Sequence, residues 1–208
     1  MTSSVRSEYA ALAARYDRRW AAYNAGSMAL LRPFVAGAEP GDVLDLACGT
    51  ANLAPRLAEW GARAGRYVGA DLAPEMLLAA RPKLAAVPFP AALATADAAA
   101  LPFRDAAFGT VVSASALHDW AEPEVVLAEV HRVLRGGGRF ILLDWCRDAL
   151  RMKALDLALR ISRNPFHRMY SSEEAAGLLR GAGFRVVRQN RAAIGFPWEL
   201  MVFDAVAE

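Results

Sequence analysis

Three aspartates are the residues of this sequence best suited to chemistry. Asp45, Asp71 and Asp97 each stand where a short segment that reads as a β-strand ends. A carboxylate has two oxygens that accept hydrogen bonds from hydroxyl, amino and ammonium groups. In open parallel sheets, ligands bind beyond the carboxyl ends of the strands. We therefore predict that the three aspartates line one edge of the sheet and bind a nucleoside-containing ligand.

The turn after the first strand consists of small residues. Ala47, Cys48, Gly49 and Ala51 follow Asp45 closely and precede a helical pattern. Small side chains let a ligand approach the backbone at the start of a helix. An alanine allows a fairly close approach when its φ angle is negative, and the exact path of this loop is left open.

Alternating strand and helix patterns position these residues. Strands are expected at 42–47, 66–71, 91–97, 108–113 and 139–144, and helices at 50–60, from Pro74 through 76–80, and at 123–134. This alternation favours an α/β fold with a doubly wound, Rossmann-like, mostly parallel sheet and helices on both faces.

The two ends of the chain depart from that alternation. Residues 1–32 read as helical, and Pro33 should break that pattern. Within the alternating region, the glycines at 136–138 should end the helix expected at 123–134. Near the other end, a helix that begins with a capping serine is expected at 172–179. Two further strands, at 184–191 and 199–206, should then form an antiparallel hairpin that completes a seven-stranded sheet.

Composition narrows the class of protein. The chain has 208 residues, of which 55 % are hydrophobic and 22 % charged, so we expect one globular domain over 1–208. A net charge of +2 is too small to indicate nucleic acid. No signal sequence or membrane-spanning run is recognisable, which favours a cytoplasmic protein. Cys48 and Cys146 lack the spacing of a zinc site, and no metal is expected.

Four segments taken together resemble the class I S-adenosylmethionine-dependent methyltransferases, most closely the small ones related to the ubiquinone/menaquinone C-methyltransferase group. They read LDLACGTANLA, VGADLAPEML, ATADAAALPFRDAAFGTVVSASALHDW and VHRVLRGGGRFILLDW. They cover roughly residues 40–145. The resemblance implies S-adenosyl-L-methionine as cofactor, S-adenosyl-L-homocysteine as product, and the seven-stranded fold with a terminal hairpin.

The resemblance also implies roles for the aspartates. Asp45 would organise the loop and bind the ammonium end of the cofactor. Asp71 would accept hydrogen bonds from both ribose hydroxyls, and Asp97 would accept one from the adenine amino group. The glycine triplet of the family corresponds to Ala47, Gly49 and Ala51, so that one glycine remains.

Other positions follow from the same resemblance. Leu72 and Met76 would contact the adenine, and the backbone N–H of Ala98 would donate to a ring nitrogen. The backbone at Ser113, Ala114 and Ser115 would meet the methionine part of the cofactor. His118, next to Asp119, is a candidate catalytic base, with a helix-capping role as the alternative.

Two segments could cover the site. Residues 5–32 form a candidate lid with Tyr16 over the cofactor, or else an aromatic stripe packed on the sheet edge. Residues 147–170 form a basic amphipathic stretch that could be an acceptor lid or lie on an anionic membrane, and the lid is favoured. Five aromatic residues could line the acceptor site: Trp145, Phe166, Tyr170, Phe196 and Trp198.

The leading hypothesis is methyl transfer to a small-molecule acceptor through proximity and orientation. An NAD-dependent oxidoreductase is the first alternative, but it needs G-x-G-x-x-G, where this chain has Ala47, Gly49 and Asn52. A non-catalytic cofactor-binding sensor or partner protein is the second. Methylation of nucleic-acid bases is disfavoured because the motif typical of such enzymes is replaced by Ser113–His118.

Overall fold

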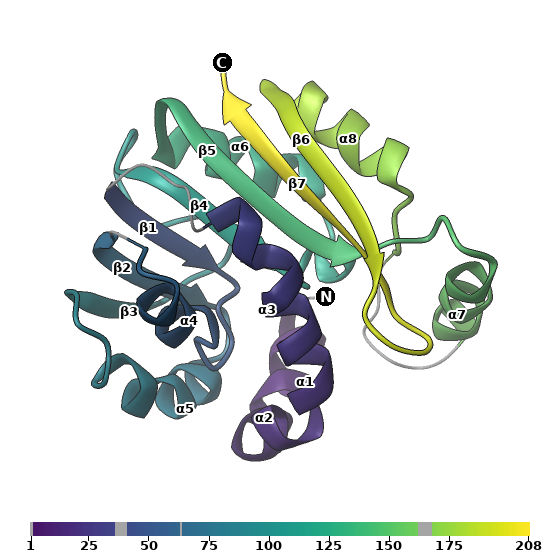
Figure 1. Ribbon diagram of the computed structural model, residues 1–208, viewed down its shortest axis with the longest axis horizontal. Helices are drawn as coiled ribbons and strands as arrows, with labels where there is room; N and C mark the ends of the chain where they lie inside the picture. Colours follow the sequence, from purple (N-terminus) through teal and green to yellow (C-terminus); the bar gives the residue numbers. More distant parts are fainter. Residues whose placement is uncertain (1, 36–40, 63, 162–167) are drawn as a thin grey trace.

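The computed structural model describes residues 2–35, 41–62, 64–161 and 168–208. Within them one seven-stranded sheet has the order β3-β2-β1-β4-β5-β7-β6 (Figure 1). Its strands are β1 (Gly41–Leu46), β2 (Ala64–Asp71), β3 (Ala91–Thr95), β4 (Phe108–Ala114), β5 (Leu134–Trp145), β6 (Phe184–Ala193) and β7 (Glu199–Ala207). The first five strands pair in parallel, and β7 pairs antiparallel with both β5 and β6. The predicted fold class is confirmed.

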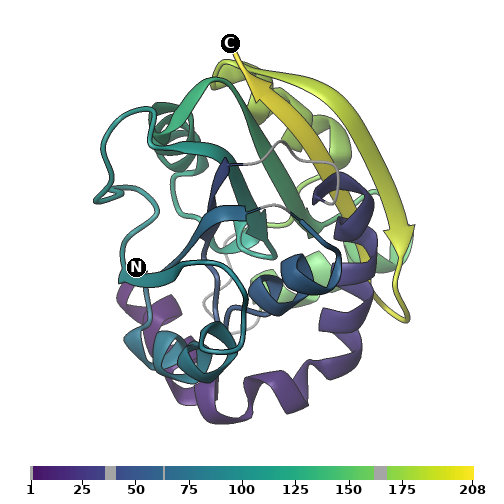
Figure 2. The ribbon, with the colours of Figure 1, turned by 60° about the vertical axis from the view of Figure 1, so that its left-hand side comes forward.

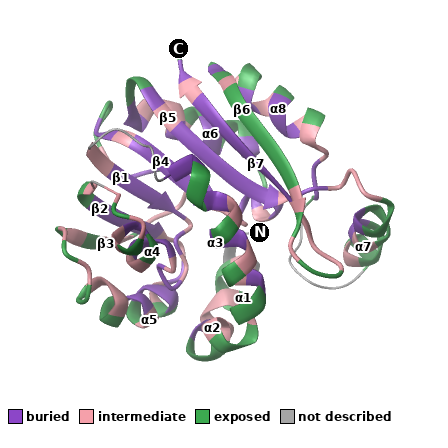
Figure 3. Cartoon of the chain, in the orientation of Figure 1, coloured by how far each residue is buried: buried purple, intermediate pink, exposed green. Residues whose placement is uncertain are grey.

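Helices cover both faces of the sheet. They are α3 (Ala21–Val35), α4 (Leu53–Glu59) and α5 (Pro74–Leu84) on one face, and α6 (Pro123–Val133) and α8 (Ser172–Gly181) on the other. A hydrophobic core lies on each face of the sheet. Neighbouring residues of β1 point to opposite faces, so Val43 packs in the core beneath α3, α4 and α5, and Leu44 packs in the core beneath α6 and α8. The central strands are buried and β6 is the exposed edge (Figure 3). No helix among the described residues is long and apolar enough to span a membrane.

The N-terminal helical region is broken into short pieces. It consists of α1 (Thr2–Leu12), a 3₁₀ turn (Ala13–Arg15), α2 (Tyr16–Arg19) and then α3. The first of these pieces lie along the carboxyl-terminal edge of the sheet, and α3 then packs against one face of the sheet (Figure 2). Pro33 does not end the helix, as the sequence predicted, but lies inside α3. Phe34 and Val35 are almost fully buried, and burying two large side chains outweighs the hydrogen bond that proline removes.

The three consecutive glycines at 136–138 do not end a helix, as was predicted for them. The helix α6 already ends at Val133, and the triplet belongs to the first part of β5. The pairing of β4 with β5 shifts register there, because Phe108 faces Leu134 but Thr110 faces Arg139. The glycines therefore form an irregularity within the strand that absorbs the extra residues.

Candidate functional site

A cavity of about 290 Å³ lies at the carboxyl-terminal edge of the parallel strands. The loops that follow β1, β2, β3 and β4 line it, and α1 to α3 close it from the other side. Nine of the ten residues predicted to bind the cofactor line this cavity: Asp45, Ala47, Cys48, Gly49, Asp71, Leu72, Met76, Asp97 and Ala98. The three aspartates thus come together, because parallel strands end at the same edge.

Asp71 is held by two backbone amides. Its Oδ2 accepts from the N–H of Gly49 at 2.7 Å, and its Oδ1 accepts from the N–H of Ala73 at 2.9 Å. These bonds connect the end of β2 to the loop after β1. Burial raises the pKa of Asp71, while the amide hydrogen bonds act in the opposite direction. Each carboxylate oxygen can accept a further bond, so both remain able to bind a pair of hydroxyls.

The loop after β1 adopts a left-handed backbone at three alternating positions. The φ angles are 56° at Ala47, 54° at Gly49 and 55° at Ala51. The two alanines therefore do not have the negative φ at which an alanine most easily allows a close approach. A left-handed alanine costs roughly 1–2 kcal/mol, and two backbone bonds support the curl: Cys48 N–H to Ala70 O and Ala51 N–H to Cys48 O. The loop keeps the shape that glycines would adopt, so the small residues curve around the cavity.

Asp45 is buried beneath this loop. Its Oδ2 accepts a hydrogen bond from the hydroxyl of Tyr67 at 2.5 Å. Burial raises the pKa of Asp45 to about 7, Asp71 adds to the rise, and the Tyr67 bond opposes it. The carboxyl group is thus poised between its neutral and charged forms near pH 7, and a cation bound beside it would favour the charged form.

Asp97 lies two residues beyond the end of β3, which stops at Thr95. Its Oδ1 accepts from the N–H of Ala99 at 2.9 Å, and Asp97 forms an isolated bridge with Ala100. This local turn directs the backbone around Ala98 along the cavity. The expected strand 91–97 is therefore shorter, and its aspartate sits in a turn.

Ser113 does not reach the cavity. It is fully buried within β4, and its hydroxyl has no hydrogen-bond partner among the residues that the structure describes. Ser115 lines the cavity instead, with a φ of 60°, and its Oγ lies 2.6 Å from the hydroxyl of Tyr23. The strand extends one residue further than predicted, to Ala114, which moves the first cavity-facing serine along the chain.

His118 lies outside the cavity lining. Its Nδ1 is 2.8 Å from Oδ1 of Asp144, and its ring stacks on Trp145 with centroids 3.8 Å apart. Burial disfavours the charged ring, but the carboxylates of Asp144 and Asp119 overcome it and raise the pKa of His118 to about 9. At neutral pH the ring is an imidazolium, which has no lone pair to accept a proton.

Three tyrosines from the N-terminal helices form the opposite wall. The hydroxyl of Tyr9 donates to Oδ2 of Asp119 at 2.8 Å, and Tyr16 packs against Tyr9 with centroids 6.3 Å apart. Tyr23 accepts from Nε1 of Trp145 at 2.8 Å. Burial and nearby carboxylates raise the pKa of Tyr16 to about 12, so this phenol is neutral. All three tyrosines and Asp119 line the cavity.

Asp17 ties these helices to the loop after β1. Its carboxylate accepts from Oγ1 of Thr50 at 2.6 Å and from Nδ2 of Asn52 at 3.0 Å, and it pairs with Nζ of Lys83 at 2.6 Å. Lys83 also donates to the carbonyl of Thr50 at 2.9 Å and to Oδ1 of Asn52 at 2.7 Å. We call Asp17, Thr50, Asn52 and Lys83 the Asp17 cluster. Residues this far apart give no shared signal in sequence.

Comparison with known proteins agrees with this geometry. A methyltransferase domain family matches residues 44–142. A curated ubiquinone/menaquinone biosynthesis C-methyltransferase of Desulfotalea psychrophila is 33 % identical over 218 aligned positions, covering 92 % of this chain and 86 % of that protein. The chain belongs to the class I S-adenosylmethionine-dependent methyltransferases. The cofactor of this family is S-adenosylmethionine.

Other relatives of this chain are similar over part of their length, and a solved structure is similar over nearly its whole length. A demethylmenaquinone methyltransferase of Thermus thermophilus is 44 % identical over 106 residues, which cover 51 % of this chain and 48 % of that protein. Across four curated relatives the chain spans 44 % to 62 % of their lengths. A solved methyltransferase in complex with the Trm112 activator of Haloferax volcanii has a TM-score of 0.81 at 26 % identity, covering 98 % of this chain and 97 % of that one.

The described residues among those predicted to form the acceptor site of this methyltransferase do not line the cavity. Phe166 lies outside the described residues. Phe196 is 90 % exposed, and Tyr170 packs in the core. Trp145 and Trp198 pack against each other behind the wall that Tyr23 forms, with their rings tilted and the centroids 5.0 Å apart. The described part of 147–170 contributes no residue to the lining, so the cavity is closed by the N-terminal helices.

Proposed function

We propose that this chain transfers the methyl group of S-adenosylmethionine to a small-molecule acceptor inside the cavity. One observation carries the proposal: a single cavity has three strand-end aspartates on one side and a wall of tyrosines with Asp119 on the other. Its volume of about 290 Å³ is close to the lower end of small-molecule sites. Family membership and the names of the relatives support the same activity.

The aspartate side fits the cofactor. Asp71, with its oxygens oriented by two amides, would accept from the ribose hydroxyls. Asp97 and the backbone at Ala98 would bind the adenine, with Leu72 and Met76 against its ring. Asp45 would face the ammonium end, where the positive charge favours its carboxylate form. When bound, the cofactor supplies a methyl group that is already electrophilic, so the protein needs only to orient the acceptor.

The tyrosine side would hold the acceptor. Tyr9 and Tyr16 are neutral because burial raises the pKa of each. The hydroxyl of Tyr16 can therefore donate a hydrogen bond to an acceptor oxygen, whereas that of Tyr9 donates to Asp119 and positions its carboxylate. Among the described residues, Asp119 is one of two carboxylate residues that line the cavity besides the strand-end aspartates, and it would receive the proton that an acceptor hydroxyl or amine loses on methylation. The other is Glu122. His118 would hold a positive charge behind Asp119, with Nε2 at 3.7 Å from Oδ2. Its role would be to position that carboxylate.

The relatives suggest which acceptors to assay first. Those of Thermus thermophilus and Desulfotalea psychrophila are named for demethylmenaquinone and for ubiquinone and menaquinone biosynthesis. A ring acceptor of this type would suit a wall of neutral tyrosines, since aromatic rings stack or meet edge to face. We therefore expect an aromatic hydroxyl compound to be methylated ahead of aliphatic amines or thiols.

Calorimetry and a turnover assay test the proposal and separate its alternatives. S-adenosylmethionine should bind and NAD should not, because the dinucleotide fingerprint is absent. Candidate acceptors are then incubated with cofactor labelled in its methyl group. Transfer of label supports the enzyme, whereas tight cofactor binding with no transfer to any acceptor would favour a sensor. The Tyr9→Phe variant should bind cofactor normally and lose about tenfold in kcat/KM through one lost hydrogen bond.

A further inference from the structure

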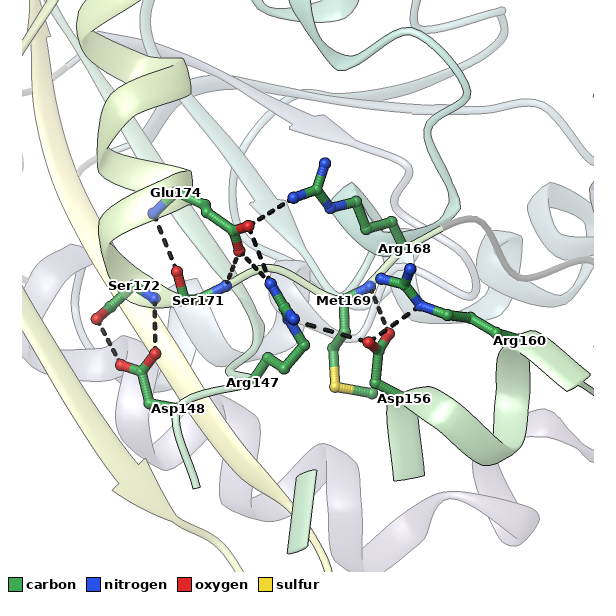
Figure 4. A network of polar contacts seen from close by, with 9 residues as sticks. All are labelled: Arg147, Asp148, Asp156, Arg160, Arg168, Met169, Ser171, Ser172 and Glu174. Carbon is green, nitrogen blue, oxygen red and sulfur yellow. Dashed lines mark hydrogen bonds and ion pairs between the residues drawn. The ribbon is translucent and has the colours of Figure 1, made fainter. Parts of the chain in front are cut away.

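One face of the helix α7 (Leu150–Ile161) is buried, and its contacts hold the helix in place. Met152 and Asp156 are buried there. Oδ1 of Asp156 accepts from the N–H of Met169 at 3.1 Å, and its Oδ2 pairs with Nε of Arg160 at 3.0 Å and lies 3.9 Å from Nε of Arg147 (Figure 4).

The same network continues to α8. Arg147 donates to both oxygens of Glu174, at 2.9 and 2.7 Å, and Arg168 donates to Oε1 of that residue at 2.5 Å. Glu174 also completes the capping box at Ser171. Because both ends of this network belong to ordered helices, the network sets which face of α7 points outward.

The outward face of α7 carries a row of large apolar side chains. Leu150 is 82 % exposed, Leu157 61 % and Ile161 77 %. At about 100° per residue these positions fall within a sector of roughly 40° on the helix. Phe196, 90 % exposed, lies in the neighbouring β6–β7 turn, which Arg151 contacts through the carbonyl of Pro197 at 3.0 Å. We call Leu150, Leu157, Ile161 and Phe196 the outer apolar row.

Positive charges flank this row on both sides. Lys153 and Arg160 lie about 60° and 80° from its centre on one side, and Arg151 lies about 100° from it on the other. The only acidic residue of α7, Asp156, is on the buried face. An apolar strip between cations is the pattern of a helix that lies in the headgroup region of an anionic bilayer. A second copy of the chain would bring like charges together, which disfavours self-association through this surface.

We propose that the outer apolar row and its flanking cations dock this protein on anionic membrane surfaces. Leu157 and Ile161 enter the boundary between headgroups and acyl chains, and Lys153 contacts lipid phosphates. Arg151 and Arg160 flank the row while paired with Glu199 and Asp156. This reverses the sequence-based preference for a lid, because the apolar row faces away from the domain. Since α7 follows β5 at the edge that bears the cavity, docking places the site near the lipid surface.

Sedimentation with vesicles tests the proposal without requiring turnover, so it is independent of the proposed function. The full chain is mixed at physiological salt with phosphatidylcholine vesicles or with vesicles containing about 30 % phosphatidylserine. Binding should occur to the anionic vesicles only. The double variant Leu157→Glu, Ile161→Glu should bind at least about tenfold more weakly. The control Leu78→Glu removes an equally exposed leucine, 58 % on α5, and should bind like the wild type.

Several results would overturn the proposal. They are absence of binding to anionic vesicles, equal binding to both vesicle types, and equal losses in the double variant and the control. A dimer that the double variant dissociates would also overturn it, since the row would then be a self-interface. Calorimetric binding of S-adenosylmethionine, unchanged in both variants, shows that the substitutions leave the fold intact.

Discussion

The charge state of His118 can be measured through the pH dependence of stability. The unperturbed ring has a pKa of 6.5, and the folded protein raises it to about 9 through Asp144 and Asp119, against the effect of burial. The folded state therefore binds the proton more tightly than the unfolded state. The stabilisation is fully present below pH 6.5 and is lost as the pH rises through about 9.

The magnitude follows from the difference between the two pKa values. A difference of about 2.5 corresponds to roughly 3 kcal/mol of unfolding free energy. The side chain of His118 is 5 % exposed, so solvent screening reduces this value little. About 2 kcal/mol should remain at pH 7.5 and almost none at pH 9.5.

Urea denaturation of wild type and His118→Gln at a series of pH values provides the assay. Glutamine can still donate a hydrogen bond to Asp144 but carries no titrating proton. The wild type minus variant difference should fall by about 2 kcal/mol between pH 7.5 and 9.5. Titration of Cys48, Cys146 and Asp45 affects both proteins and cancels in that difference. A difference in unfolding free energy that stays constant from pH 7.5 to 9.5 would refute the raised pKa of His118. A neutral His118 would then be a candidate catalytic base.

Three further predictions concern the cavity. Asp71→Asn should weaken S-adenosylmethionine binding by roughly tenfold to a hundredfold, because a bond to a charged acceptor is worth about 1.5–3 kcal/mol; a calorimetric dissociation constant within about twofold of wild type would contradict the ribose assignment. Asp17→Ala removes the acceptor shared by Thr50, Asn52 and Lys83, so amide hydrogen exchange over 16–24 should become faster; unchanged exchange would show that the Asp17 cluster does not hold the lid. With a pKa of about 7, Asp45 should release a proton when the cofactor ammonium binds near pH 7; calorimetry in phosphate and in Tris should show this release in wild type, and Asp45→Asn should lack it.

The fold class and the position of the three aspartates could be predicted from the order of the residues alone. Strand and helix periodicities depend on neighbouring residues, and parallel strands must end at one edge. Asp45, Asp71 and Asp97 therefore meet whatever the details of packing. The terminal hairpin was also predictable, since alternating segments around Gly195 and Pro197 indicate strands joined by a turn.

Tertiary structure decided what each polar side chain does. The left-handed alanines at 47 and 51 follow from bonds to Ala70 and within the loop, which local preference does not specify. His118 contacts Asp144, twenty-six residues away, and this carboxylate raises the pKa of the ring. The outward direction of Leu157 depends on Asp156 being bonded to Met169. Such contacts join distant parts of the chain, and their energies outweigh local propensity once the core has formed.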